Sequence, residues 1–344
     1  MTSENDILFE RRGAAGLVTL NRPRALNALT HGMVVAMKAK LDEWAEDSAI
    51  ACVVVCGAGE RAFCAGGDIR AVRESGLAGT SYALDFWHDE YILDAAIKHY
   101  PKPYVALIHG VCMGGGIGVS AHGRFRVADE TALFAMPETG IGFFPDVGGS
   151  YLLSRRGYLG MYMALTGARL KTPDALFVQL ATDFVPAGLT GAILEDLSAG
   201  RPVAETIASR AEDAGAAPLA ALREDIERCF SLECVEAILE ALDATGTGWA
   251  RETAAVIRTK SPTSLKLAFR ELREGKRLPF DDCMRMEYRM ASRILSGHDF
   301  YEGVRAVLID KDNAPSWKPY ALGGVSEEAI AAYFAPLGDR ELRL

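Results

Sequence analysis

The sequence predicts an α/β fold that continues into a helical C-terminal region. Short apolar strands alternate with helical segments up to about residue 190. Beyond that point the segments are rich in Ala, Leu and Glu, which is typical of helices. The chain has 344 residues, of which 49% are hydrophobic and 24% are charged. A chain of this length and composition can bury a large core.

The first half of the chain supplies the predicted strands. Residues 17–20 and 50–56 are apolar runs of the kind that strands form, and the second is continuous enough to be covered on both faces. Between them, a helix is expected after Thr30, because apolar residues then recur every three or four positions. Further strands are predicted at 104–108, 125–128 and 132–134, with a short helix from Gly114 to about Gly123.

The second half is predicted to be helical. Ser261 and Pro262 are typical of a helix start, and Asp281 or Asp282 is expected to cap the next helix. A last helix is expected over 299–310, with its apolar side chains facing inward. The other helices are predicted at 204–214, 219–230 and 233–243.

Composition and charge disfavour several classes of partner. Acidic residues outnumber basic ones by 46 to 37, a net charge of −9, which disfavours nucleic acid and anionic membranes. The apolar run 105–121 contains His109 and several glycines and therefore fails as a membrane span. Residues 1–10 show no pattern typical of a signal or transit peptide. We therefore expect a cytoplasmic location.

The cysteines and histidines give no sign of a disulfide framework or a metal site. The 7 cysteines are an odd number without a Cys-x-x-Cys pair. The 6 histidines show no spacing typical of zinc ligands. We expect no metal.

Two glycine loops follow the two buried strands of the first half. One is Cys64-Ala65-Gly66-Gly67-Asp68 and the other is Met113-Gly114-Gly115-Gly116. Backbone amides in such loops can point at an oxygen, and one amide from each loop would form an oxyanion hole. The alternative is that the glycines only permit tight turns. A dinucleotide site is disfavoured, because the helix after the second loop is too short, and no serine-hydrolase motif is present.

Two carboxylates lie in apolar surroundings at Glu138 and Asp146. Burial raises the pKa of a carboxyl group and prepares it for acid or base catalysis, while an ionised Glu can also attack a thioester. The alternatives are that Glu138 caps a turn and that Asp146 begins a helix at Val147.

These motifs identify the chain as similar to the crotonase, or enoyl-CoA hydratase/isomerase, superfamily. More narrowly, it resembles the 3-hydroxyisobutyryl-CoA hydrolase branch of that superfamily, over residues 7–320. The superfamily motifs are Asn-Arg-Pro at 21–23, Ala-Leu-Asn at 25–27, Phe-Cys-Ala-Gly-Gly-Asp at 63–68, Lys-Pro at 102–103 and Gly-Gly-Gly at 114–116. The branch motifs lie at 104–110, 134–139, 144–149, 297–300 and 302–306.

The resemblance implies a crotonase-type spiral of ββα units over residues 5–200, with residues 201–344 as a helical region packed on it. It places an acyl-CoA carbonyl between the amides of Gly67 and Gly115. It also implies Glu138 and Asp146 as catalytic acids and Glu90 as a substrate contact. On sequence alone, Glu90 would be taken for a solvated residue of a helix.

The resemblance further implies that Arg24, Ala65 and Asp68 face the CoA part of the substrate, and it leaves Lys260 and Lys266 as unassigned candidates. No cofactor is expected beyond this CoA. The implied substrate is a short 3-hydroxyacyl-CoA, most simply 3-hydroxyisobutyryl-CoA of valine breakdown, with 3-hydroxypropionyl-CoA left open. Asp183 departs from the histidine expected there. A homo-oligomer is compatible with the sequence.

One position separates hydrolysis from hydration. Hydratases that resemble this chain usually carry a second glutamate two residues after the triple glycine, where this chain has Gly118. Hydration divides its proton transfers between two acids, whereas a thioester needs one nucleophile or base and a stabilised oxyanion. Two alternatives stay open, namely a hydratase or isomerase with a different pair of acids and an acyl-CoA-binding subunit without activity.

Overall fold

The computed structural model describes residues 5–344, and they divide into two compact units. The first unit comprises the chain up to Asp68, Asp89–Ala135 and Arg169–Ala220, and the second comprises Ile69–His88, Met136–Ala168 and Ala221–Leu344. This division differs from the predicted boundary at residue 200. The segments 69–88 and 136–168 belong with the C-terminal helices, so Glu138 and Asp146 lie in the second unit rather than in the predicted core.

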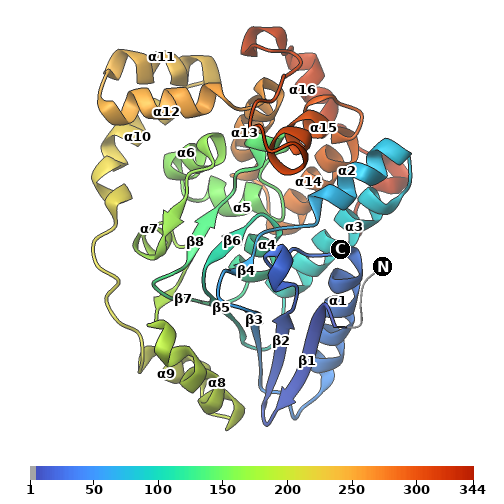
Figure 1. Ribbon diagram of the computed structural model, residues 1–344, viewed down its shortest axis with the longest axis vertical. Coiled ribbons are helices and arrows are strands. Elements are labelled where there is room, and N and C mark those ends of the chain that lie inside the picture. Colours follow the sequence, from blue (N-terminus) through green and yellow to red (C-terminus); the bar gives the residue numbers. More distant parts are fainter. Residues whose placement is uncertain (1–4) are drawn as a thin grey trace. The chain divides into compact units, whose positions relative to one another are not determined.

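The first unit contains two β-sheets (Figure 1). One has the strand order β1-β2-β3-β5-β7-β10 and the other has the order β4-β6-β8-β9. Strands β1 and β2 are antiparallel, as are β8 and β9, and the other neighbours are parallel. The strands are β1 (Ile7–Arg12), β2 (Ala15–Leu20), β3 (Cys52–Gly57), β4 (Ala62–Cys64), β5 (Tyr104–Ile108), β6 (Val111–Met113), β7 (Phe125–Ala128), β8 (Leu133–Ala135), β9 (Leu170–Lys171) and β10 (Asp183–Phe184).

Consecutive strands alternate between the two sheets. From β3 to β8, each odd-numbered strand joins the six-stranded sheet and each even-numbered strand joins the four-stranded sheet. Helices separate these pairs, so the chain winds as a spiral of ββα turns, and the predicted fold class is confirmed. The helical elements of this unit are η1 (Pro23–Ala25), α1 (His31–Glu46), α4 (Gly115–Ala121), α7 (Thr172–Phe177), η3 (Ala187–Leu189), α8 (Thr190–Ser198), α9 (Val203–Ala208) and the end of α3 (Tyr82–Lys98).

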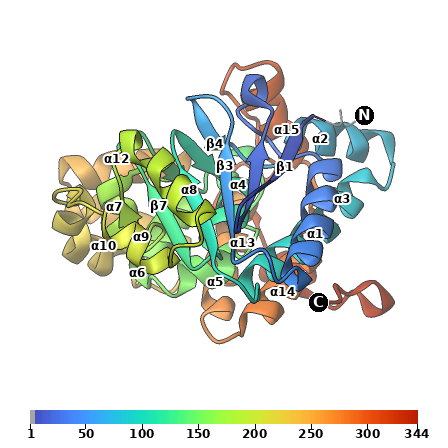
Figure 2. The same cartoon turned by 90° about the horizontal axis from the view of Figure 1, so that it is seen from below.

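Helices α8 and α9 cover one face of the six-stranded sheet (Figure 2). Ile193 and Leu197 of α8 and Ile207 of α9 are buried against apolar side chains of the strands. Val54 of β3 and Val105 of β5 belong to the same cluster, and both are fully buried. The opposite sides of these strands are buried as well, which explains their continuous apolar sequence.

The second unit is helical. Its elements are α2 (Ile69–Ala78), the start of α3, η2 (Glu138–Ile141), α5 (Gly149–Ser154), α6 (Tyr158–Thr166), α10 (Arg223–Phe230), α11 (Val235–Thr245), α12 (Gly248–Arg258), α13 (Pro262–Gly275), α14 (Phe280–Ile294), α15 (Asp299–Val304), η5 (Arg305–Ile309), η6 (Leu322–Gly324), α16 (Glu327–Phe334) and η7 (Gly338–Arg340). The 3-10 turn η4 (Pro218–Leu222) lies at the boundary of the two units.

Several predicted helix boundaries are wrong. The helix expected at 204–214 ends at Ala208, and a 3-10 turn replaces the start of the one expected at 219–230. Pro279 precedes α14, so Asp281 and Asp282 lie in its first turn and do not cap it. The helix expected over 299–310 changes to a π-helix at Arg305, and α16 follows it.

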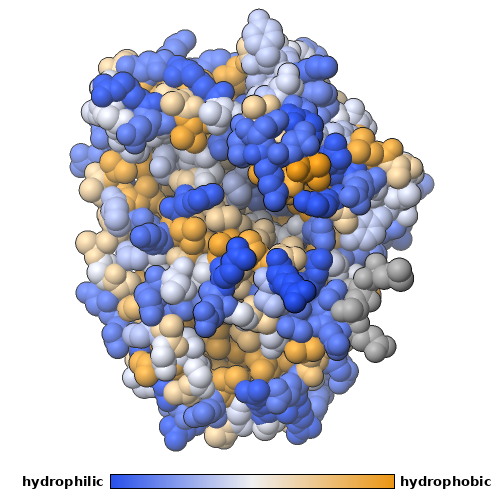
Figure 3. Space-filling view, in the orientation of Figure 1, coloured by the Kyte–Doolittle hydropathy of each residue, from blue (hydrophilic) through white to orange (hydrophobic). Residues whose placement is uncertain are grey.

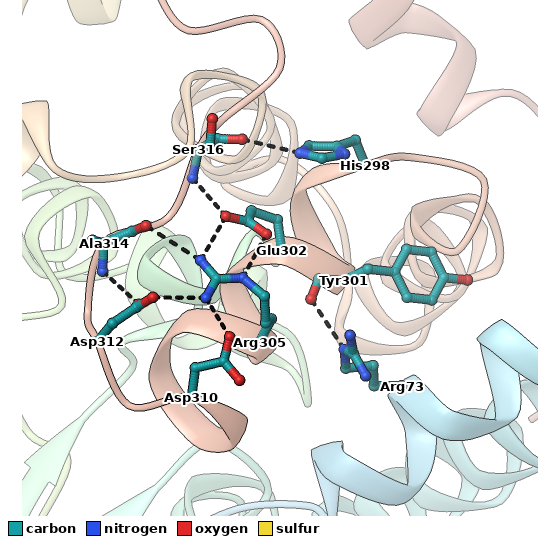
Figure 4. Close-up of polar contacts among 9 residues, drawn as sticks. All are labelled: Arg73, His298, Tyr301, Glu302, Arg305, Asp310, Asp312, Ala314 and Ser316. Atoms are coloured by element: carbon teal, nitrogen blue, oxygen red, sulfur yellow. Dashed lines mark hydrogen bonds and ion pairs between the residues drawn. The ribbon is translucent and has the colours of Figure 1, made fainter.

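Arg305 joins α15 to the chain that follows it through several hydrogen bonds and ion pairs (Figure 4). Its guanidinium bonds to both oxygens of Glu302, at 2.9 and 2.8 Å, and to Asp310 and Asp312, at 2.6 and 2.7 Å. Glu302 also accepts the Ser316 amide, which ties the following loop to α15. The motif at 302–306 therefore has a structural role in folding the chain after α15.

Two glycines allow α15 and η2 to approach closely. A Cβ atom on Gly303 would lie 2.3 Å from the carbonyl carbon of Ile141. A Cβ on Gly142, whose φ is +72°, would lie 2.1 Å from the carbonyl oxygen of Asp299. This contact fixes the turn that carries Glu138.

We expect Gly142→Ala to lower the free energy of unfolding by about 3 kcal/mol or more, because it adds a backbone clash to the cost of a left-handed alanine. Gly79→Ala is the matched control, since Gly79 has a φ of +67° with nothing within 4 Å of the added Cβ. The control should cost about 1 kcal/mol. Urea denaturation of both variants measures the difference, and equal losses would contradict the packing argument.

Within residues 5–344, no helix combines the length and apolarity that a membrane span needs. In the space-filling view, hydrophilic side chains cover most of the visible face, with apolar groups in small patches among them (Figure 3). Scattered apolar groups of this kind are normal on a protein surface.

Candidate functional site

The first glycine loop is pinned to the chain before α1. The Leu29 amide donates to the carbonyl of Gly66, and the Asp68 amide donates to the carbonyl of Leu29, both at 2.8 Å. These two bonds flank Gly67. The Gly67 amide itself donates to no carbonyl or side chain among residues 5–344.

The second glycine loop approaches the first directly. A Cβ atom on Gly115 would lie 3.2 Å from the Gly67 nitrogen, and a Cβ on Gly66 would lie 3.6 Å from the Gly115 nitrogen. Gly115 is the first residue of α4, where helix amides have no partner within the helix. Its amide has no acceptor in the described part of the chain. The two amides are therefore adjacent and available, as an oxyanion hole requires.

Glu90 of α3 lies beside this pair of amides. Its side chain is only 2% exposed, and its Oε1 would be 2.5 Å from a Cβ on Gly115. The interpretation of Glu90 as a solvated helix residue is thus wrong. The structure brings Glu90, Gly67 and Gly115 together within the first unit.

The residues predicted to face CoA also lie in the first unit. Ala65 and Asp68 flank the Gly66-Gly67 pair, and Arg24 is exposed on η1. Asp68 forms an ion pair with Arg22, at 3.1 Å, so this loop is joined to the Asn-Arg-Pro motif. Arg22 was not singled out from the sequence, although the same motif contains it. The CoA contacts stay a prediction.

Asn27 is the last residue of the neighbouring Ala-Leu-Asn motif. Its side-chain amide donates to the carbonyls of Ala58 and Ala62, at 2.9 and 2.8 Å, and its oxygen accepts the Arg22 amide at 3.0 Å. Asn27 is fully buried and takes a φ of +57°, which asparagine tolerates better than most residues. These bonds hold the segment between β3 and the start of β4, which leads into the first glycine loop.

Glu138 begins the 3-10 turn η2 in the second unit. It is 6% exposed, and its Oε2 has no hydrogen-bond partner among the described residues. Burial, with a contribution from the negative charge of Asp146, raises the pKa of Glu138 well above its usual value. The side chain does not cap η2, so the interpretation of Glu138 as a turn cap is wrong.

Asp146 lies in the loop before α5 and is 5% exposed. Helix α5 begins at Gly149, with Gly148 as its N-cap residue and no side-chain cap. The expectation that Asp146 begins a helix at Val147 is therefore wrong. Val147 instead takes a left-handed conformation with a φ of +51°.

Two further buried acids, Glu271 of α13 and Glu287 of α14, were missed from the sequence. Both are 0% exposed. Burial, together with the charges of Glu287, Asp146 and Glu138, raises the pKa of Glu271 well above its usual value. Each acid falls among the buried apolar residues of an amphipathic helix, and this position was the available signal.

The remaining candidates are less informative. Lys266 forms an ion pair with Glu236, at 2.9 Å, and donates to the carbonyl of Val325, so it has a structural role. Lys260 lies near Gly140, next to η2. Asp183 is in β10. No group of three or more His, Cys, Asp or Glu residues within 5–344 is arranged to hold a metal ion.

Comparison with known proteins identifies the family. The family described as Enoyl-CoA hydratase/isomerase matches residues 15–334. The protein from Danio rerio named 3-hydroxyisobutyryl-CoA hydrolase, mitochondrial, is 49% identical, covering 99% of this chain and 92% of the relative. The Homo sapiens protein of the same name is 46% identical, covering 98% of this chain and 90% of the relative.

Solved structures share the fold. A carnitinyl-CoA dehydratase from Mycobacterium thermoresistibile has a TM-score of 0.95 at 44% identity, covering 99% of both chains. An enoyl-CoA hydratase from Rhodobacter sphaeroides has a TM-score of 0.92 at 38% identity, covering 98% of this chain and 100% of the other.

The relatives also correct the predicted location. The expectation of a cytoplasmic protein is contradicted, because these relatives are named as mitochondrial enzymes. That expectation rested on the lack of a recognisable targeting pattern in residues 1–10, of which residues 1–4 lie outside the described structure. Targeting is read by separate machinery and is independent of how the domain folds. The sequence match, over nearly the whole chain, shows that this protein belongs to the enoyl-CoA hydratase/isomerase family.

Proposed function

We propose that this protein hydrolyses 3-hydroxyisobutyryl-CoA to 3-hydroxyisobutyrate and free CoA. The observation that carries the proposal is the adjacent pair of available amides at Gly67 and Gly115, which can stabilise the negative oxygen formed when a thioester carbonyl is attacked. The names of relatives at 45 to 49% identity supply the substrate and favour a place in valine breakdown.

In this reaction Glu138 supplies the attacking group or activates it. One route forms a bond between a Glu138 oxygen and the thioester carbon, releases CoA thiolate, and leaves an anhydride that water then hydrolyses. In the other route, Glu138 takes a proton from water as the water attacks. Both routes consume one water and need no cofactor beyond the CoA of the substrate.

The other residues have supporting roles in the proposal. Asp146 positions the hydroxyl of the acyl group or the attacking water. Glu90 contacts the substrate beside the oxyanion hole, consistent with its place next to Gly115. Arg24, Ala65 and Asp68 bind the CoA portion, for which the exposed guanidinium of Arg24 supplies a positive charge.

A hydratase or isomerase activity is the second candidate. The enoyl-CoA hydratase at 38% identity favours it. Gly118 of α4 opposes it, because this position offers no second acid for hydration.

A pair of assays tests the proposal. The protein is offered (S)-3-hydroxyisobutyryl-CoA with a thiol reagent, and separately crotonyl-CoA, whose enoyl absorbance is followed in the ultraviolet. We expect free thiol from the first and no loss of absorbance from the second. Loss of enoyl absorbance alone would support the hydratase, and silence in both assays would favour an acyl-CoA-binding subunit.

A further inference from the structure

The loop after Asp146 holds an unusual backbone conformation. Val147 has a φ of +51° and Gly148 a φ of +82°, so two consecutive residues are left-handed. For a β-branched residue such as Val147 this conformation is a genuine outlier, and it persists only where the surroundings enforce it. Val147 is 1% exposed, so these surroundings are the packed interior of the second unit.

Glu287 of α14 is hydrogen-bonded to this turn. Its Oε2 accepts the Gly148 amide at 2.7 Å, and its Oε1 accepts the Ser150 amide at 2.9 Å. The Ser150 hydroxyl donates to the same Oε1 at 2.5 Å. One carboxylate thus receives three hydrogen bonds from the segment that directly follows Asp146, whose own carbonyl accepts the Gly149 amide at 2.7 Å.

Burying this acid is costly for the fold. Burial raises the pKa of Glu287 to about 8, although the donors from Ser150 and Gly148 lower it. A second acid, Glu271, is also fully buried, and neither of its carboxyl oxygens has a partner in the described part of the chain. An apolar side chain in place of Glu287 would avoid burying a polar carboxyl group. This cost suggests that the carboxylate serves more than stability.

We propose that Glu287 is a positioning residue for Asp146, because its carboxylate clamps the left-handed turn that sets the direction of the Asp146 side chain. The inference rests on the proposed function, in which Asp146 contacts the substrate or the attacking water. Glu287 does not take part in the chemistry itself and acts through Asp146 alone.

The test replaces one atom of the clamp. In Glu287→Gln, an NH₂ group replaces one of the two carboxyl oxygens. This group can only donate a hydrogen bond, so it cannot accept one from Gly148 or Ser150, and at least one of the three bonds is lost. We expect kcat to fall by about 10-fold to 100-fold with little change in KM, because a misplaced group costs rate without removing binding. Asp282→Asn is the matched control, since it changes a partly exposed acid to an amide on the same helix and should leave kcat unchanged.

A double-mutant cycle separates positioning from a general loss of structure. In an Asp146→Asn background, Glu287→Gln should lower kcat by less than about 2-fold, because the residue through which it acts is already disabled. The same fold-loss in both backgrounds would overturn the proposal. Ser150→Ala removes only the hydroxyl donor and keeps both amides, so it serves if Glu287→Gln folds poorly. We expect a smaller loss from it, again absent in the Asp146→Asn background.

Hydrogen exchange provides a readout that does not depend on the reaction. The amides of Gly148 and Ser150 should exchange faster in Glu287→Gln and at the wild-type rate in Asp282→Asn. Unchanged exchange rates in Glu287→Gln would contradict the proposal that Glu287 holds the turn. A wild-type protein without hydrolase activity would overturn the proposed function instead, and the exchange rates would still decide whether Glu287 holds the turn.

Discussion

The Glu138→Gln variant is expected to lose thioesterase activity by about 10³-fold or more, because an amide can neither attack the carbonyl carbon nor accept a proton from water. The substitution keeps the size of the side chain, and the Oε2 it replaces has no partner among the described residues. Binding of CoA should therefore be retained. The measurement is kcat from released thiol, with CoA affinity measured by product inhibition.

The pH dependence gives an independent check on Glu138. Because burial raises its pKa well above the usual value, the acid is protonated in the folded protein at pH values where it is ionised in the unfolded chain. Folding then retains a proton that unfolding releases, so the stabilising effect is complete at low pH and is lost as the pH rises toward the raised pKa. As the pH rises from below the usual carboxyl pKa toward the raised pKa of Glu138, we expect the thermal midpoint of Glu138→Gln to fall less than that of the wild type.

Two results would contradict the role of Glu138. Near-normal kcat in Glu138→Gln would exclude it as nucleophile or base. A large drop in thermal stability at acidic pH, below the raised pKa of Glu138, would mean that lost activity reflects lost structure, because the protonated wild-type side chain resembles glutamine in shape. Glu274→Gln is a suitable control, because Glu274 is a partly exposed acid of α13 in an ion pair with Arg270.

The sequence predicted the parts of this fold that depend on local pattern. The buried strands β3 and β5 have continuous apolar sequences, and a glycine-rich loop follows each of them in the sequence. What the sequence could not predict is the regrouping of segments. Residues 136–168 lie between two strand-forming stretches, yet they pack with helices that come more than 50 residues later. Such long-range packing leaves no local signature.

The candidate site shows the same limit residue by residue. Glu138 and Asp146 were recognisable as acids in apolar surroundings. Glu90 was not, because a glutamate in a helix is ordinarily solvated, and only the resemblance pointed to it. Glu287 depends on hydrogen bonds to Gly148 and Ser150, about 140 residues earlier in the chain. The only local sign of its role was an acidic residue among the buried apolar residues of α14.

Gly115→Ala is expected to produce the other large loss, because it fills the space in which the thioester oxygen would lie. The added Cβ would be 3.2 Å from the Gly67 nitrogen and 2.5 Å from Oε1 of Glu90. Losing one donor of an oxyanion hole typically costs about 10²-fold to 10³-fold in kcat, and a methyl group here disturbs both donors. We expect a loss of at least about 10³-fold, measured by thiol release.

Gly188→Ala is the matched control for this variant, because Gly188 lies in the same unit and a Cβ there meets nothing within 4 Å. It should leave kcat unchanged. In Gly115→Ala, CoA affinity should be kept, since the contacts of the nucleotide are made by other residues in the proposal. Activity within a few-fold of the wild type would show that the carbonyl oxygen is not held by these two amides. Because the oxyanion interaction strengthens as charge develops on that oxygen, the loss should appear in kcat far more than in KM.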